Sequence, residues 1–386
     1  MRKPMKIVVS HHSLNLAGGG ENVCLKLIGI LCKRGNDVTL ATVDMVDWDF
    51  INKLFDEEII SLKEFHLIRN LPNINFTFLF DSIILMLYFL KLLFLKLTTK
   101  GLLISTCGEK ISSVADIIYV NGLPLRCAFR LPSTSIRKKC YSILYHIFLK
   151  FIDKINPSII IANSKFSGEI IEKCLKRRAI IIHPPVNTKR FFMAGKNARR
   201  KNIVVTTTRF LPNQNLDYVL KVASIVKEAK FLVFGVSPKY SSTLERLKKL
   251  TLKMDVGDRV RIMVNQPFSR FLRALSEAKV FFRTVPFETF GISIVEAMAA
   301  GCVPVVPRNG GPWIDILDRK NGLYGFSYRS VDEAANIINM LLKNEDLRSK
   351  ISFRARLRAL DFDQSVFERK ILMVVNKVYR KIGDLM

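Results

Sequence analysis

Two glutamates, Glu288 and Glu296, flank a short loop that leads into an apolar helical segment. The first backbone N–H groups of a helix lack partners within it, and the helix dipole adds partial positive charge, so such a start can bind an anion. Gly291 lets a ligand approach the backbone closely. Glu296, about one turn into the helix, can accept hydrogen bonds from the vicinal hydroxyls of a ribose, and Glu288 can contact hydroxyls beyond the phosphates. The pattern indicates a nucleotide diphosphate sugar, although acids at a helix start also occur for stability alone.

A second candidate phosphate contact is the glycine turn formed by Gly18, Gly19 and Gly20, between an apolar strand and a helical segment. Glycines at a helix start present bare N–H groups to a ligand. Alone this is a weak signal, because three glycines also form ordinary tight turns.

Histidines and cysteines give no metal signature. His11 and His12 follow the first strand and could reach a ligand, but packing within a loop is the commoner role. His183 precedes two prolines and is expected to cap a strand end. Zinc-like spacings are missing, as is a DxD between plausible strands, so the sequence implies neither a bound metal nor a cofactor.

Alternating strands and helices must position these residues. In the first half, short β-branched runs predict strands, and apolar residues at helical spacing predict helices. Strands are expected at 6–10, 37–42, 101–106, 116–120, 158–162 and 179–182, and helices at 21–33 and 165–175.

The second half repeats this alternation. Strands are expected at 202–207, 230–234, 259–263, 280–282 and 303–306, and helices at 216–229, 268–277, 292–300, 332–342 and 345–360. Such alternation predicts parallel sheets covered on both faces. We therefore expect an α/β protein with two Rossmann-like domains facing each other across a cleft, with ligands at the carboxyl ends of the strands.

The boundary between the two halves is expected at residues 187–202, which are basic, polar and aperiodic and are interpreted as a linker. The predicted domains are then 1–186 and 203–364, followed by a closing helix at 365–386. A length of 386 residues suits two domains.

The charge is strongly positive, with 61 lysines and arginines against 33 aspartates and glutamates and a net charge of +28. Such a chain attracts nucleic acid, an anionic membrane face or phosphorylated small molecules. Nucleic acid is the weakest of these, because no signature of a nucleic-acid-binding fold stands out. Seven scattered cysteines favour free thiols in a reducing compartment, and a strand rather than a secretory signal opens the chain.

The most apolar stretch, residues 76–97, is interrupted by Asp81, Lys91 and Lys96. A membrane-spanning helix needs roughly 20 apolar residues with few charges. We therefore favour a core helix with one membrane-facing side, from which the two lysines could extend to an interface, over a true span.

At this point the sequence resembles a known family. Residues 287–311 look like the E-x7-E region of retaining glycosyltransferases with the GT-B fold (family 4). The segment from Gly310 to Asp315 is similar to the GGP-x-x-D of the α-1,2-mannosyltransferases of lipid-linked oligosaccharide assembly. The glycine turn ending at Glu21, the pair Asn163-Ser164 and residues 183–187 also resemble that group, so the resemblance covers most of the chain.

The resemblance implies roles for residues and domains. Residues 1–186 would bind the acceptor and residues 203–364 the nucleotide sugar. Glu296 would hold the ribose and Glu288 the transferred sugar, while Thr289, Phe290 and Gly291 would contact sugar and phosphate through their backbone. Gly19 and Gly20 would close over the diphosphate from the other side.

The family's basic pair is only half present. Relatives have an arginine and, five positions later, a lysine after the first strand of the second domain. Here Arg209 fits, but Gln214 occupies the lysine position, and an amide cannot neutralise the charge of a leaving group. Lys239, Arg270 and Arg283 are candidate substitutes.

A second departure is Asn121, which stands where relatives often carry a histidine near the sugar. Asparagine can hydrogen-bond a hydroxyl but cannot act as an acid or base near neutral pH. In this family the departing phosphate is thought to accept the acceptor's proton, so Asn121 is compatible with catalysis. The expected catalytic set is Glu288, Arg209 and Asn121.

The resemblance implies a retaining hexosyltransferase of N-glycan biosynthesis that moves a mannose-like sugar from a nucleotide diphosphate sugar to a lipid-linked or other glycan. It would lie peripherally on the cytoplasmic face of an anionic membrane. The alternative that Gln214 favours is a catalytically weak sugar- or lipid-binding partner protein with the same fold. A nucleotide-sugar epimerase is less compatible with the E-x7-E pattern, and nucleic acid is not an expected partner.

Overall fold

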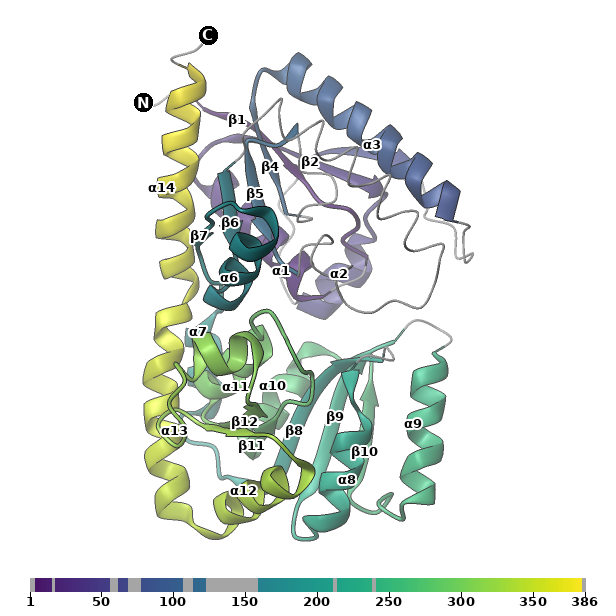
Figure 1. Ribbon diagram of the computed structural model, residues 1–386, viewed down its shortest axis with the longest axis vertical. Helices are drawn as coiled ribbons and strands as arrows, with labels where there is room; N and C mark the ends of the chain where they lie inside the picture. Colours follow the sequence, from purple (N-terminus) through teal and green to yellow (C-terminus); the bar gives the residue numbers. More distant parts are fainter. Residues whose placement is uncertain are drawn as a thin grey trace. The chain divides into compact units, whose positions relative to one another are not determined.

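The computed structural model describes residues 4–15, 18–55, 62–68, 78–106, 114–122, 159–210, 214–237 and 241–383. The chain divides into two compact units (Figure 1). Unit 1 comprises Met1–His183 together with Phe367–Met386, and unit 2 comprises Pro184–Val366.

Unit 1 contains a parallel sheet whose first strand, β1 (Lys6–Ser10), lies between β2 and β4. The strand order is β3 (Lys63–Ile68), β2 (Asp37–Asp44), β1, β4 (Leu102–Ser105), β5 (Ile117–Val120), β6 (Ile159–Ala162) and β7 (Ile180–Ile181). The described helices of this unit are α1 (Gly19–Lys33), α2 (Trp48–Phe55), α3 (Phe78–Thr99), α6 (Lys165–Leu175) and most of α14 (Gln364–Gly383). The central strands are buried along nearly their whole length, which explains their continuous apolar sequences.

Unit 2 contains a second parallel sheet, ordered β10 (Val260–Val264), β9 (Lys230–Val236), β8 (Lys201–Arg209), β11 (Ala278–Phe282), β12 (Val303–Pro307) and β13 (Phe326–Tyr328). Counted along the chain, this is the Rossmann order 3-2-1-4-5-6, and the order reverses between β8 and β11. Ligands of such sheets bind beside this reversal, at the carboxyl ends of the strands.

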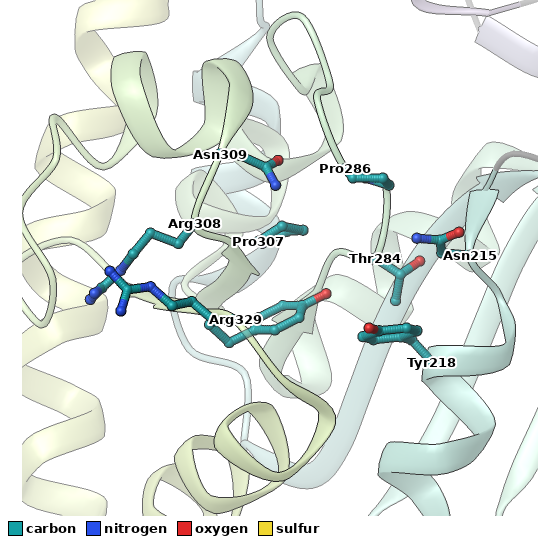
Figure 2. Close-up of a pocket in the computed structure, with 9 residues that line it drawn as sticks. Asn215, Tyr218, Thr284, Pro286, Pro307, Arg308, Asn309 and Arg329 are labelled. Carbon is teal, nitrogen blue, oxygen red and sulfur yellow. The ribbon is translucent and has the colours of Figure 1, made fainter. Parts of the chain in front are cut away.

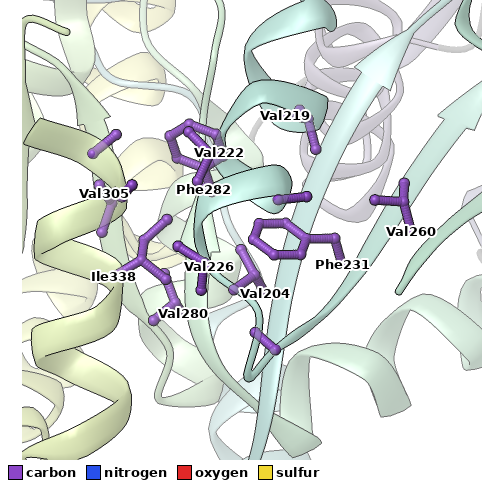
Figure 3. Close-up of a cluster of buried hydrophobic side chains, with 14 of the residues drawn as sticks. Val204, Val219, Val222, Val226, Phe231, Val260, Val280, Phe282, Val305 and Ile338 are labelled. Atoms are coloured by element: carbon purple, nitrogen blue, oxygen red, sulfur yellow. The ribbon is translucent and has the colours of Figure 1, made fainter. Parts of the chain in front are cut away.

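Helices cover both faces of the unit 2 sheet. They are α7 (Thr188–Gly195), α8 (Asp217–Ile225), α9 (Ser242–Lys253), α10 (Phe268–Glu277), α11 (Ile292–Ala300), α12 (Val331–Lys343) and α13 (Glu345–Ala359). One core joins α8 and α12 to the sheet through residues such as Val222, Phe231 and Ile338 (Figure 3). The other core joins α7, α10, α11 and α13 to the sheet. The predicted fold class, two parallel-sheet Rossmann-like domains of α/β type, is therefore confirmed.

Several predicted elements have the bounds that the sequence indicated, including β1, α6, α10 and α11. The predicted helix 216–229 is too long, because Val226 leaves the helical conformation with ψ at 90° and is completely buried. Helices α2, α7 and α9 and strands β3 and β13 were not predicted.

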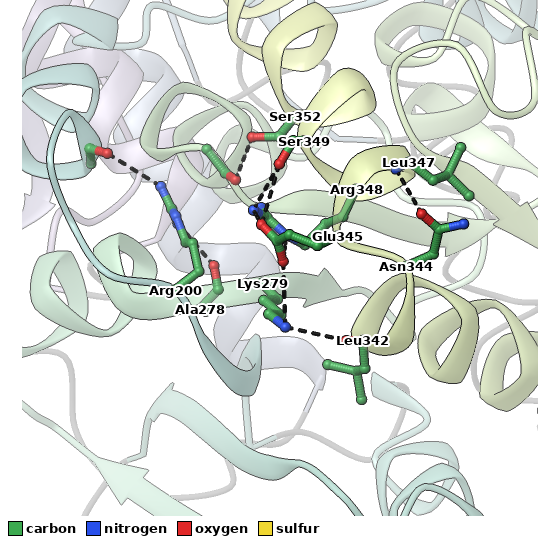
Figure 4. Close-up of polar contacts among 12 residues, drawn as sticks. Arg200, Ala278, Lys279, Leu342, Asn344, Glu345, Leu347, Arg348, Ser349 and Ser352 are labelled. Carbon is green, nitrogen blue, oxygen red and sulfur yellow. Dashed lines mark hydrogen bonds and ion pairs between the residues drawn. The ribbon is translucent and has the colours of Figure 1, made fainter.

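The predicted linker is part of unit 2. Residues 187–202 contain helix α7, which begins where the Asn187 side chain accepts a hydrogen bond from the Arg190 N–H. Phe191 is 2% exposed within the core beside α11. The side chain of Arg200 donates to the backbone carbonyl of Ala278 at 2.8 Å (Figure 4). It also donates to the backbone carbonyl of Ala300. A short helix anchored by one apolar side chain has too little periodicity to recognise in sequence, which is why this segment resembled a linker.

Helix α3 has two faces of opposite character. Ile84, Tyr88, Leu92 and Leu95 are buried in the unit 1 core. The other face carries exposed apolar side chains, at Met86, Leu87, Leu90, Leu93, Phe94 and Leu97. In the described part of the chain, no helix combines the length and apolarity that crossing a membrane requires.

The lysines of α3 do not extend from its exposed face as expected. Lys91 Nζ donates to the carbonyl of His66 (2.9 Å) and lies 4.5 Å from the centre of the Phe65 ring. Lys96 Nζ is 2.7 Å from Asp116 Oδ1. Both cations are held by the body of unit 1, which leaves the exposed face of α3 apolar.

Of the four cysteines within the described residues, Cys24, Cys32 and Cys302 are free thiols. Cys174 is disulfide-bonded, so the expectation of free thiols throughout is wrong at this position.

Candidate functional site

The loop from β11 to α11 is shaped by residues that leave ordinary backbone geometry. Phe287 and Gly291 have positive φ angles of 54° and 101°, and Gly291 is the N-cap of α11. A β-carbon at Gly291 would lie 3.3 Å from Glu288 Oε2. The carboxylate of Glu288 is therefore folded back over the start of α11, where backbone N–H groups are unpaired.

The two glycines after β12, Gly310 and Gly311, pack against the backbone of this loop. The N–H of Gly311 donates to the Glu288 carbonyl at 2.8 Å. A side chain at Gly311 would collide with the Thr289 carbonyl oxygen, and one at Gly310 would press on the backbone of Glu288. Asn309 completes the support, since its Oδ1 accepts from the Phe287 N–H at 2.8 Å. The glycine pair is thus required by close backbone packing under the acidic loop.

Glu288 is engaged by an arginine that follows β11. Arg283 Nε and Nη2 donate to Glu288 Oε2 and Oε1 at 2.6 and 2.7 Å. Both side chains are largely buried, with 10% of Arg283 and 17% of Glu288 exposed. Both residues were candidates from the sequence, but their pairing was not predicted.

The other predicted donor-site residues of unit 2 surround the same strand ends. Arg209 is the last residue of β8 and is exposed. Gln214 is buried, and its carbonyl accepts from the Thr284 hydroxyl at 3.0 Å. Glu296 lies about one turn into α11 and is half-buried.

Thr289 and Phe290 complete the loop. Thr289 is half-buried. The ring of Phe290 lies 5.3 Å from that of Phe362 in the core, so only its backbone faces the loop.

The candidate substitutes for the missing lysine differ in their surroundings. Lys239 lies outside the described residues. Arg270 is exposed, and its Nη1 donates to Gln266 Oε1 at 2.7 Å. Arg283 forms the bidentate pair with Glu288 described above.

A pocket of about 220 Å³ lies beside this loop and was not predicted (Figure 2). It is lined by residues from α8 and from the ends of β11, β12 and β13, namely Asn215, Tyr218, Thr284, Pro286, Pro307, Arg308, Asn309, Tyr328 and Arg329. Neither Glu288 nor Glu296 lines it. Arg308 has side-chain partners within unit 2. Its Nε donates to Ser327 Oγ at 2.9 Å, and its guanidinium lies 5.3 Å from the centre of the Trp313 ring.

In unit 1, the polar residues at the carboxyl ends of the strands form a network. Asn121 Nδ2 donates to the Thr106 carbonyl, and Asn163 Nδ2 donates to the Asn121 carbonyl, both at 2.9 Å. A β-carbon at Gly20 would lie 3.5 Å from the side chain of Asn121. Gly19 is exposed at the start of α1. The glycine turn and Asn121 are thus brought together, as neighbours at one edge of the sheet.

His11 is buried within this network, which supports the packing role. Its Nδ1 lies 2.7 Å from Thr106 Oγ1, and its Nε2 lies 3.6 Å from Glu21 Oε1. Burial alone would lower the pKa of His11, but hydrogen bonds to Cys24 and Glu21 outweigh burial and raise the pKa to about 9. Glu21 also accepts from the Gly18 N–H at 2.8 Å, so the histidine secures the residue that caps α1.

Across the described residues, no group of three or more His, Cys, Asp or Glu side chains could hold a metal ion.

Comparison with known proteins links unit 2 to a defined enzyme class. Residues 188–358 match the family of glycosyl transferases group 1. This range contains the acidic loop, α11 and the glycine pair.

Curated relatives that the chain resembles carry the name of a mannosyltransferase. The chain is 26% identical over 255 residues to the GDP-Man:Man(3)GlcNAc(2)-PP-Dol alpha-1,2-mannosyltransferase of Dictyostelium discoideum, covering 60% of this chain and 50% of the relative. It is 28% identical over 259 residues to the protein of the same name from Xenopus laevis, covering 62% and 53%. The chain therefore spans about half the length of the curated relatives it matches.

Solved structures share the whole fold. HepE of Anabaena, determined with UDP and glucose, has a TM-score of 0.73 at 15% identity and covers 96% of this chain and 99% of its own. Sucrose-phosphate synthase of Thermosynechococcus elongatus has a TM-score of 0.77 at 16% identity, with 99% and 100% covered. The GT-B fold predicted from the sequence is confirmed. The matching family and the named relatives are glycosyltransferases.

Proposed function

We propose that this protein is a retaining glycosyltransferase of family 4. It moves a hexose, with mannose favoured, from a nucleotide diphosphate sugar to a lipid-linked saccharide at the cytoplasmic face of a membrane. The observation that carries the proposal is the loop before α11, where the Glu288 carboxylate folds back over the helix start and Glu296 follows about one turn into the helix. This loop lies inside the segment that matches glycosyl transferases group 1. The names of the curated relatives favour mannose and a dolichol-linked acceptor.

In this proposal the start of α11 receives the diphosphate. The N–H groups around Gly291 donate to phosphate oxygens, and Arg209 supplies a cation at the end of β8. Glu296 accepts from the ribose hydroxyls, and Glu288 accepts from the hydroxyls of the transferred sugar. As the sugar departs, developing charge on the phosphate is stabilised by these fixed donors rather than by a metal or cofactor.

The donor half of the proposal is tested by nucleotide-sugar binding. Melting temperatures are measured with GDP-, UDP- and ADP-sugars for the wild type and for Glu296→Ala. We expect one nucleotide family, GDP-sugars by preference, to raise the wild-type melting temperature and to lose this effect in the variant. Transfer of labelled mannose from GDP-mannose to a lipid-linked oligosaccharide then tests the reaction itself. A wild type that no nucleotide sugar stabilises would contradict the proposal.

The membrane part of the proposal is supported by α3 and by the net charge. Six exposed apolar side chains follow one another at helical spacing along α3, from Met86 to Leu97. An apolar helix face can enter the interfacial region of a bilayer, and a protein of charge +28 is attracted to anionic lipids. A polyprenyl-linked acceptor would lie at the same surface.

Vesicle pelleting tests this surface. The wild type should pellet with anionic vesicles in a salt-sensitive way and much less with neutral ones. The double variant Leu90→Glu, Phe94→Glu should lose binding, whereas Leu252→Glu, at an even more exposed leucine on α9, should keep it. Equal pelleting of the α3 variant and the wild type would remove α3 from the proposal.

A second candidate function is a catalytically weak partner protein that binds sugar or lipid. Gln214 favours it, because this position lacks the cation that relatives use. Gln214→Lys distinguishes the two functions: a weak partner would bind the nucleotide sugar without transfer, and the lysine would raise turnover from near zero. A wild type with steady turnover excludes the weak-partner function.

A further inference from the structure

Arg283 is a buried cation that the proposed function leaves without a role. It follows β11 directly, and 10% of its side chain is exposed. All three of its guanidinium nitrogens have partners within unit 2. Nε and Nη2 donate hydrogen bonds to the Glu288 carboxylate. Nη1 donates to the carbonyl of Thr207 and, at 3.3 Å, to the Thr207 hydroxyl.

The backbone and neighbours of Arg283 are fixed by the sheet. Its N–H donates to the Val305 carbonyl at 2.9 Å, and its own carbonyl accepts from the Tyr328 hydroxyl at 2.8 Å. Thr207 in turn donates to Ser293 Oγ in the first turn of α11 at 2.9 Å. The guanidinium therefore links the acidic loop to β8 directly, and to the start of α11 through Thr207.

A bidentate arginine fixes the plane of a carboxylate without using its full accepting capacity. The two oxygens of a carboxylate offer about four acceptor positions, and Arg283 occupies two of them. The remaining positions can accept from sugar hydroxyls. The position of Gly291 beside Glu288 Oε2 shows that the carboxylate is held against the helix start, where a diphosphate sugar would bring its hexose.

We infer that Arg283 is a positioning residue, which orients Glu288 toward the transferred hexose and does not replace the missing lysine as a phosphate ligand. The inference rests on the proposed function, in which Glu288 contacts that sugar. As a consequence, recognition of the hexose depends on Arg283 through Glu288. Binding of the diphosphate depends instead on Arg209 and on the backbone at Gly291.

The test compares binding of the nucleotide sugar with binding of the bare nucleoside diphosphate. Calorimetry with GDP-mannose and GDP, together with transfer kinetics, is carried out on the wild type, Arg283→Gln, Arg283→Lys, Glu288→Gln and the Arg283→Gln, Glu288→Gln double variant. Arg283→Gln should lower kcat/KM by about a hundredfold, as expected when a group that contacts substrate loses its position. It should also weaken GDP-mannose but leave GDP affinity unchanged.

Two further comparisons separate orientation from charge. Lysine keeps the charge but cannot form the two parallel hydrogen bonds, so Arg283→Lys should resemble Arg283→Gln. In the Glu288→Gln background, Arg283→Gln should add little, because the residue through which it acts is already altered. Arg246→Gln, which breaks the exposed pair with Asp217, is the matched control and should behave as the wild type.

The binding and kinetic results for Arg283→Gln distinguish a positioning residue from a phosphate ligand. Equal loss of GDP and GDP-mannose affinity in an Arg283→Gln variant that keeps the wild-type melting temperature would make Arg283 a phosphate ligand and overturn the inference, as would wild-type kinetics in that variant. Retained GDP binding shows that the variant is folded. A wild type that binds neither GDP nor GDP-mannose would overturn the proposed function and the inference with it, which is distinct from failure of Arg283 alone.

Discussion

The two units share a strand order but place different chemistry at the carboxyl ends of their strands. In unit 2 the acidic loop carries a charged pair, Arg283 with Glu288, beside a glycine at positive φ. In unit 1 the corresponding edge carries the amides of Asn121 and Asn163, which bond to backbone carbonyls, and a histidine that is buried below them. The charged pair of unit 2 therefore lies in the loop of the candidate donor site, whereas the charged pair of unit 1, His11 with Glu21, lies within a network of amides and hydroxyls.

This difference explains where the family signal lies. A diphosphate makes the same demands in every donor, so a fixed helix start with glycines and charged partners leaves little freedom in sequence. Amides and hydroxyls can rearrange to suit different hydroxyl groups, which agrees with the proposal that unit 1 binds the acceptor. The family match accordingly covers 188–358, within unit 2.

The largest effect is expected from the glycines that support the acidic loop. In Gly311→Ala the new methyl group collides with the Thr289 carbonyl, a backbone atom that can move only if the whole loop moves. We expect loss of more than about 3 kcal/mol of stability in unit 2 and no measurable hexose transfer. Urea unfolding measures the loss of stability, and a transfer assay measures the loss of hexose transfer.

Gly20→Ala is the matched substitution in unit 1. Its methyl group would make an ordinary contact with Asn121 at 3.5 Å, and alanine favours the helix that begins there. Stability should stay the same or rise slightly. A fall in donor affinity in this stable variant would support the proposed approach of a ligand to Gly20. Similar unfolding by both substitutions would contradict the contrast between the units.

Much of this organisation could be predicted from sequence because it depends on local patterns. The apolar runs of β1 and β8, the amphipathic periodicity of α10 and the apolar stretch of α11 that ends at Gly301 can be recognised without tertiary contacts. Glu288 and Glu296 were found in the same way, since their spacing around Gly291 is a local property.

What could not be predicted depends on contacts between distant or sharply turned segments. The pairing of Arg283 with Glu288 needs the turn at Phe287, whose φ of 54° is unusual for a phenylalanine. Helix α7 is stabilised by Phe191 in a core that α10, α11 and α13 form with strands of the unit 2 sheet. Lys91 and Lys96 were expected to reach outward, but their partners His66 and Asp116 come from other elements.

A smaller effect is expected from the enclosed charge of unit 1. The folded-state pKa of His11, about 9, lies above its ordinary value of 6.5. The protonated histidine therefore contributes stability that is fully present below pH 6.5 and is lost as the pH rises toward 9. The free energy of unfolding should fall by up to about 1.4 kcal/mol per pH unit across this window, and His11→Gln should lack that part of the slope. Equal slopes in both proteins would show that His11 is not charged in the folded state.

The smallest effect is expected from a charged cluster on the surface of unit 2. Glu345 contacts Arg348 and Lys279 (Figure 4), and the hydrogen bond from Arg348 lowers the pKa of Glu345 to about 2. A depressed pKa stabilises the folded state above the ordinary value of 4.5, and this contribution is lost as the pH falls from 4.5 toward 2. Because 57% of the Glu345 side chain is exposed, solvent screens the interaction, and Glu345→Gln should cost at most about 1 kcal/mol at pH 7.

Salt provides the decisive comparison between these two charged sites. Added salt should weaken the contribution of Glu345, which is exposed, and leave that of the buried His11–Glu21 pair nearly unchanged. Unfolding of both variants and the wild type at low and high ionic strength measures this. If salt weakened both sites equally, His11 would be open to solvent, and burial would no longer distinguish the His11–Glu21 pair of unit 1 from the exposed cluster of unit 2.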